Sequence, residues 1–179
     1  AIYDSLYNYT YSVTNLNSIN LRGGQGTLFV TMVGNTITNY SQNPVANEIG
    51  DCFIENNSGD DVTTSYKVVR VNGELNIRQR DITIQARSGE WVYDGTTHTL
   101  NEYTYPSNLV SGQTLTSVDI TGSQLELGQS ANHPHDAVIK TAGGVDVTNN
   151  YNINYVDGSL KVTANQNAIV VTSGDQSWE

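Results

Sequence analysis

Charge, cysteine and long apolar runs are scarce in this chain, and each shortage excludes a class of protein. Charged residues make up 15% of the 179 residues, against roughly 25% in an average soluble domain. Eight Lys and Arg stand against eighteen Asp and Glu, so the net charge is −10. We expect neither nucleic acid nor an anionic membrane surface as a partner, because both bind through basic patches. No apolar run approaches the roughly 18 residues of a membrane-spanning helix, so we expect no membrane span, and the opening residues lack the pattern of a signal peptide.

Cys52 is the only cysteine, so no disulfide forms within the chain. We predict that it is a small buried strand residue, since a free cysteine behaves as a small apolar side chain; a reactive or intermolecular thiol is the alternative. Thr, Asn, Ser, Gly and Tyr are abundant, which favours strands with solvated outer faces. The composition favours an all-β protein with an extracellular or cell-surface location.

What the chain does contain is a repeat. Residues 60–77 and 145–162 share a pattern at a separation of 85, in the pairs Val62/Val147, Thr63/Thr148, Tyr66/Tyr151, Val71/Val156, Gly73/Gly158 and Leu75/Leu160. A fixed period is the signature of a repeat architecture. We therefore predict two tandem small β-sandwich-like modules, Ig-like or β-grasp-like, arranged end to end.

Each copy ends in a pattern typical of a β-hairpin. Apolar and polar residues alternate over 151–155 and again over 160–162, on either side of Asp157-Gly158. Asn72-Gly73 takes the same place in the first copy. Because a type I′ turn needs positive φ at both central residues, such pairs predict a two-residue hairpin turn.

Other short runs predict further strands, and no segment has the period and caps of a helix. Residues 27–34 place the apolar residues at 28, 30 and 32 on one face, and residues 81–86 and 114–122 alternate in the same way. The predicted domains are module one at 1–80, module two at 81–166, and the opening strand of a following module at 167–179. Residues 168–178 resemble 81–91, whereas module one has no such strand before Tyr3.

One part of this pattern resembles a known family. Trp91 is followed by Val92-Tyr93-Asp94-Gly95-Thr96, and residues 146–162 come some fifty residues later. This arrangement resembles the tandem YDG/MBG-type repeats of bacterial cell-surface and adhesin proteins, over nearly all of 83–163 and more weakly over 3–82. The signature becomes Tyr3-Asp4-Ser5-Leu6 in module one. The resemblance implies non-catalytic stalk modules.

The candidate sites follow from the repeat. We expect the junction between modules, where a strand passes from one module to the next, to involve Tyr3, Tyr93 and the tryptophans of the opening strands. The residues predicted for this junction are Trp91, Ile169, Val171, Trp178, Tyr3 and Tyr93.

Metal and catalytic sites have less support in the sequence. Asp51 and Asp61 recur as Asp136 and Asp146; they are candidate calcium ligands, although Asp also caps turns through its own backbone. The segment His133-Pro134-His135-Asp136 has metal-ligand types, but its counterpart, residues 48–51, has no histidine, which favours a polar loop. No catalytic motif is present, so we expect no enzyme and no other cofactor.

The function predicted from these features is structural. The chain reads as a non-catalytic repeat segment of an extracellular bacterial surface fibre or adhesin stalk, assembling head to tail by strand handover between copies or as continuous tandem repeats. The alternative is a carbohydrate- or protein-binding adhesin module for a host glycan or protein, with Tyr103, Tyr105 and Tyr155 as a stacking platform. Asn8, Asn39 and Asn56 stand in glycosylation triplets.

Overall fold

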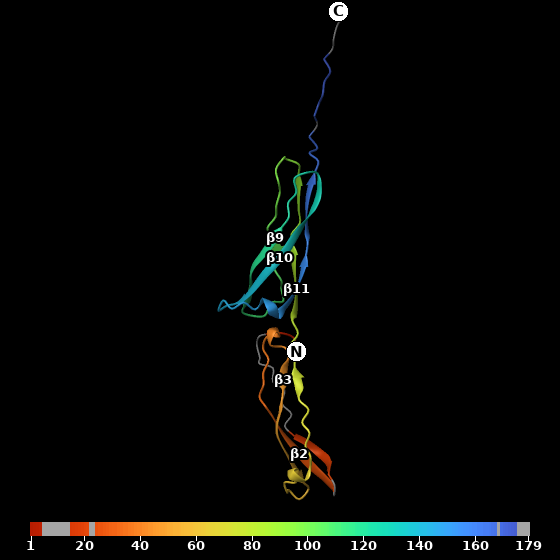
Figure 1. Cartoon of the computed structure of the whole chain (residues 1–179). Helices are drawn as coiled ribbons and strands as arrows, with labels where there is room; N and C mark the ends of the chain where they lie inside the picture. Colours follow the sequence, from red (N-terminus) through yellow and green to blue (C-terminus); the bar gives the residue numbers. More distant parts are fainter. Residues whose placement is uncertain (5–14, 22–23, 168, 175–179) are drawn as a thin grey trace, which may run out of the picture. The chain divides into compact units, whose positions relative to one another are not determined.

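The computed structural model describes residues 1–4, 15–21, 24–167 and 169–174, and this part of the chain is all-β (Figure 1). It contains twelve strands and three short 3-10 turns. The chain divides into two compact units. The first unit comprises Ala1–Ile82, Asn108–Gln113 and Lys140–Asn152, and the second comprises Thr83–Ser107, Thr114–Ile139 and Ile153–Glu179. Three stretches of the predicted second module, residues 81–82, 108–113 and 140–152, thus belong to the first unit.

The first unit contains two sheets. An antiparallel sheet has the order β1-β2-β4, with β1 at Asn15–Leu21, β2 at Gly24–Met32 and β4 at Ile49–Asn56. A two-stranded antiparallel sheet joins β3 (Val45–Asn47) to β5 (Gly73–Leu75). The 3-10 turns η1 (Tyr40–Gln42), η2 (Thr63–Ser65) and η3 (Thr148–Asn150) also belong to this unit.

Two further sheets contain the remaining strands. One has the order β7-β12-β10-β9, with β7 (Gly89–Val92) parallel to β12 (Gly158–Thr163). The other has the order β11-β6-β8. The remaining bounds are β6 at Arg80–Ala86, β8 at Tyr103–Thr104, β9 at Gln113–Thr121, β10 at Gly128–Thr141 and β11 at Tyr151–Val156.

Strand β6 shows why these residues form strands. Ile82, Ile84 and Ala86 are buried, while the residues between them are exposed. This period of two puts every apolar side chain of the strand on one face. The strands predicted over 81–86 and 114–122 are thereby confirmed, as β6 and β9.

The predicted hairpins are wrong. Strand β11 pairs with β6, whereas β12 pairs with β10 and β7, so Asp157-Gly158 connects two different sheets. Gly158 is needed for a close approach rather than for a positive φ, because a Cβ there would lie 2.3 Å from the Arg87 carbonyl oxygen. In the first copy, residues 67–72 form no strand, and β5 pairs with β3 instead.

Local hydrogen bonding recurs at the separation of 85. In the pair β3 and β5, Val45 lies opposite Leu75 and Asn47 opposite Gly73. In the pair β10 and β12, Ser130 lies opposite Leu160 and Asn132 opposite Gly158. The turns η2 and η3 also lie 85 positions apart.

Candidate functional site

A buried polar cluster in the first unit contains Tyr3, Gln113 and Tyr151. Gln113 Nε2 donates to the Tyr3 hydroxyl at 2.8 Å, and the Tyr151 hydroxyl donates to Gln113 Oε1 at 2.5 Å. The two tyrosine rings meet edge to face, with centroids 5.7 Å apart. Val110 N donates to the Tyr151 hydroxyl at 3.1 Å. Each of these buried polar side chains therefore has a hydrogen-bond partner, as a stable interior requires.

The backbone around Tyr3 holds it in this cluster. Tyr3 N donates to the Arg78 carbonyl at 2.9 Å, and Arg80 Nε donates to the Tyr3 carbonyl at 2.9 Å. In the second unit, Tyr93 N donates to the Thr163 carbonyl at 2.8 Å. Tyr3 and Tyr93 thus have matching backbone contacts, but the Tyr3 side chain is 1% exposed and that of Tyr93 is 38% exposed.

The other residues predicted for the junction lie elsewhere. Trp91 stacks on His98 inside the second unit, with ring centroids 4.7 Å apart. Ile169 and Val171 lie outside any strand and are 91% and 89% exposed. Trp178 lies outside the described residues. Of these six predictions, Tyr3 is the one that the structure places among buried residues from both predicted modules.

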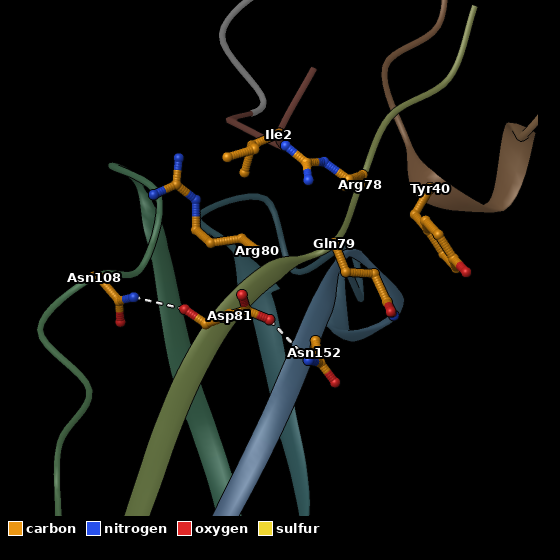
Figure 2. A pocket seen from close by; sticks show the side chains of 8 residues that line it. All are labelled: Ile2, Tyr40, Arg78, Gln79, Arg80, Asp81, Asn108 and Asn152. Carbon is orange, nitrogen blue, oxygen red and sulfur yellow. Dashed lines mark hydrogen bonds between the residues drawn. The ribbon is translucent and has the colours of Figure 1, made fainter.

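A polar hollow of about 560 Å³ opens beside the start of β6 (Figure 2). Its hydrogen bonds are internal, since Asp81 accepts from Asn108 Nδ2 through its carbonyl at 2.6 Å and from Asn152 Nδ2 through its carboxylate at 2.7 Å. The Arg80 guanidinium that lines it is already bonded to Tyr3. The hydrogen bonds of Arg80, Asp81, Asn108 and Asn152 therefore lie within the first unit. They are Ile2, Tyr40, Arg78, Gln79, Arg80, Asp81, Asn108 and Asn152.

A different hollow in the first unit is apolar, with a volume of about 290 Å³, and we name it the apolar groove. Leu28, Val30 and Met32 of β2 line it together, which confirms that they share one face. Val69 and Val71 also line it and are 70% and 78% exposed. The full set is Leu28, Val30, Met32, Asn47, Ile49, Cys52, Val68, Val69, Arg70, Val71 and Gly73.

The matching positions of the second copy are covered. Val30, Asn47 and Cys52 are half-buried, whereas Leu115, Asn132 and Ala137, 85 positions later, are buried. Cys52, predicted as a buried strand residue, lies in β4 as expected but is half-buried and lines the apolar groove.

The end of β6 and the residue after it lie against Asn132 and Gly158 in the second unit. Asn132 Nδ2 donates to the Arg87 carbonyl at 3.0 Å and to the Leu100 carbonyl at 2.9 Å. Gly158 lies against the backbone of Ala86 and Arg87, as its blocked Cβ position shows. Gly158 and Asn132 thus contact the backbone at the end of β6, at Ala86 and Arg87.

No described residue takes that place in the apolar groove. Asn47 Nδ2 makes no hydrogen bond with the described part of the chain, and a Cβ on Gly73 would meet nothing nearer than the Asn47 Cβ at 3.9 Å. The glycine and the asparagine are therefore present at both copies, but in the first one no described residue takes the place of Arg87 beside them.

Two of the calcium candidates serve as turn caps. Asp61 Oδ1 accepts from the backbone N and the hydroxyl of Thr63, and Asp146 Oδ1 accepts in the same way from Thr148. The hydroxyl bond first, and then the backbone bond, holds the pKa of each carboxyl below its usual value of 3.8. The predicted capping role is confirmed at both positions.

The other two calcium candidates have different surroundings. Asp51 bonds Thr31 only through its backbone, and Asp136 adopts a φ of 49° with its carboxylate 2.8 Å from His135 Nδ1. Among the described residues, one set of metal-ligand types converges, Asp119, His135 and Asp136, with its ligand atoms within 4.8 Å of one another. His133 instead bonds Asp157, at 2.6 Å. Exposed carboxylates commonly converge without a metal, so this set does not define a site.

The predicted tyrosine platform and glycosylation positions take part in the fold. The Tyr105 hydroxyl accepts from Leu115 N and the Tyr155 hydroxyl from Ala137 N, both at 2.9 Å, and Tyr103 is half-buried in β8. Asn39 Oδ1 accepts from Asn150 Nδ2 at 3.0 Å, and Asn56 Nδ2 donates to Asp60. Asn8 lies outside the described residues.

Within the described part of the chain, the structure has no helix long and apolar enough to cross a membrane. Comparison with known proteins found no matching protein-family model, no matching curated protein and no matching solved structure. The resemblance to YDG/MBG-type repeats therefore stays a prediction from the sequence.

Proposed function

We propose that this chain is a structural, non-catalytic segment of an extracellular bacterial surface fibre or adhesin stalk, built from tandem β-modules with a period of about 85 residues. The modules join head to tail, so the partners are copies of the chain or neighbouring repeats of one polypeptide. The proposed function of the fibre is to extend from the cell surface and to bear mechanical load.

The recurring registers support the tandem arrangement. The pairs β3–β5 and β10–β12 match position for position at the separation of 85, and the aspartate-capped turns at Asp61 and Asp146 do the same. Equal registers at a fixed separation are what two copies of one module produce.

The observation that carries the proposal is the buried cluster of Tyr3, Gln113 and Tyr151. Tyr3 comes from the predicted first module, and Gln113 and Tyr151 come from the second, yet all three are buried in one unit. Asn150 Oδ1 also accepts from Tyr40 N at 2.8 Å in this unit. Satisfied buried polar contacts of this kind fix a single geometry between successive segments, which a load-bearing stalk requires.

Electron microscopy of intact source cells tests the proposal. With an antibody against this chain and a gold-labelled secondary antibody, we expect gold along thin fibres that leave the cell surface. Gold confined to the cell interior would contradict the proposal.

Denaturing gel electrophoresis of the same fibres separates the two modes of assembly. A band near the chain mass of 19.5 kDa, or a ladder built on it, supports separate subunits. One very large band supports continuous tandem repeats.

A further inference from the structure

We propose that the apolar groove of the first unit is a docking site for the segment Ile169 to Gly174 of a second copy of this chain, which adds to it as a strand. The inference rests on the proposed function and names the partner surface through which copies join. Strand addition is a common mode of recognition, in which alternate side chains enter a groove while the backbone completes a sheet.

The groove lacks the strand that its counterpart has. In the second copy, β11 pairs with β6, and the inward residues Ile84 and Ala86 are buried. In the first copy, residues 66–71 take the place of β11 but form no strand, and Val69 and Val71 remain exposed. The described part of the first unit therefore offers an apolar surface beside a segment that pairs with no described strand.

The segment that starts at Ile169 has the sequence of such a strand. Ile169, Val171 and Ser173 correspond to Ile82, Ile84 and Ala86, so two β-branched apolar residues and one small residue recur on one face. The side chains of Ile169, Val170 and Val171 are 79% exposed or more. Burying the side chains of Ile169 and Val171 would stabilise the pair, since removing apolar surface from water is favourable.

The residues at one end of the groove, Asn47 and Gly73, can accommodate Gly174 at the end of the docked segment. Gly174 corresponds to Arg87, whose carbonyl receives the Asn132 amide and lies over Gly158 in the second unit. Asn47 and Gly73 line the apolar groove with the same amide and the same bare backbone, and no described residue takes the place of Arg87 there. The carbonyl of Gly174 can therefore accept from Asn47 Nδ2 while its backbone passes over Gly73.

Charge does not oppose this docking. The segment from Ile169 to Gly174 is uncharged, and no described residue that lines the groove is an Asp or a Glu. Arg70, the single charged lining residue, lies on a segment with exposed neighbours and keeps its head group in water. A chain with a net charge of −10 thus meets its copy through an uncharged contact.

Cys52 lines the groove and supplies a chemical probe for the test. In the full chain, single cysteines replace residues 169 to 173 in turn, and each variant is oxidised with copper phenanthroline and separated on a non-reducing denaturing gel. We expect dimers and longer ladders for Ile169→Cys and Val171→Cys, and at least about tenfold less for Val170→Cys, because alternate strand residues face away from the groove. The variant Cys52→Ala, which has the residue of the second copy, removes the ladder.

A second substitution tests the groove itself. In the Val171→Cys variant, Gly73→Ala is expected to lower the constant for association between two copies about tenfold. The added methyl group would stand where the backbone of the docked segment passes. Equal yields of disulfide-linked dimer for cysteines at positions 169 to 173 would overturn the inference. A disulfide formed within one chain, seen as a product with the mass of one chain, would also overturn it.

The outcomes separate this inference from the function on which it rests. Fibres labelled on the cell surface, together with no alternating crosslinks, would refute strand addition between copies and leave the stalk in place. Absence of labelled fibres would refute the stalk, whatever the purified chain does.

Discussion

At the scale of single residues, the two glycines at the separation of 85 have similar sequence contexts and different surroundings. Gly158 lies against two carbonyl oxygens, of Arg87 and Ala86, whereas Gly73 has none within 4 Å. Neither has the positive φ that a hairpin turn would have required. Glycine thus permits close backbone packing at Gly158, whereas at Gly73 no described backbone packs against it.

This difference predicts that alanine destabilises the chain more at Gly158 than at Gly73. Gly158→Ala is expected to destabilise the chain by about 1–3 kcal/mol, since the backbone must shift to admit the methyl group. Gly73→Ala is expected to leave the stability of the dilute chain within about 1 kcal/mol, because its methyl group would meet no described atom nearer than the Asn47 Cβ at 3.9 Å. Urea unfolding followed by circular dichroism measures both. A loss of stability in Gly73→Ala as large as in Gly158→Ala would show that the groove is filled within one chain.

The aspartate caps predict a dependence of stability on pH. The pKa of Asp146 lies below its usual value in the folded chain, so its stabilising contribution is present above the unfolded pKa of about 4 and is lost as pH falls through the folded pKa. Melting temperatures measured at pH 7, 4 and 2.5 report the loss of this stabilising contribution. Asp146→Asn keeps an acceptor oxygen but does not titrate, so we expect a lower melting temperature at pH 7 and a smaller decrease on acidification.

The control for this prediction is Asp51→Asn. It removes the same charge from a carboxylate that accepts no hydrogen bond from the described residues. Equal melting temperatures of the two variants at pH 7 would contradict a role for the cap.

At the scale of elements, the first residues of the chain contact the first residues of β9 and β11. Tyr3 reaches Gln113 at the start of β9 and Tyr151 at the start of β11. This cluster therefore joins the first residues of the chain to two strands that come more than 100 residues later in the sequence.

Removing one hydroxyl from this cluster is expected to weaken it. Tyr3→Phe keeps the ring contact with Tyr151 but leaves the buried Gln113 Nε2 without an acceptor, which costs about 1–3 kcal/mol. Urea unfolding measures the change. Tyr105→Phe is the matched control, because the Tyr105 side chain is half exposed and water can replace its contact with Leu115. A greater loss in the control would contradict the importance of the cluster.

At the scale of the whole molecule, strand addition predicts that one region becomes protected as the concentration rises. Docking stabilises the bound form by mass action, so backbone amides of residues 67–72 should exchange more slowly in a concentrated sample than in a sample diluted about a hundredfold. Amides of β11 already pair with β6 and should not respond. Hydrogen exchange with mass spectrometry measures both segments in one experiment. Equal exchange of residues 67–72 at both concentrations would contradict docking.

Much of the local structure follows from the residues alone. Alternating apolar residues are sufficient to predict β6 and β9 and the shared face of Leu28, Val30 and Met32, because side-chain direction in a strand depends only on neighbours along the chain. The caps at Asp61 and Asp146 follow for the same reason, since each bonds a residue two positions later. The period of 85 is also visible without coordinates.

Pairing between distant segments was decided by the tertiary structure. The alternation around Asp157-Gly158 is compatible with a hairpin, yet β11 and β12 enter different sheets because β6 and β10 offer them partners far away in sequence. The cluster at Tyr3 and the apolar groove have the same origin, because both bring together residues that no local pattern relates. The corresponding motifs at Gly73 and Gly158 therefore differ in whether a described segment lies over them.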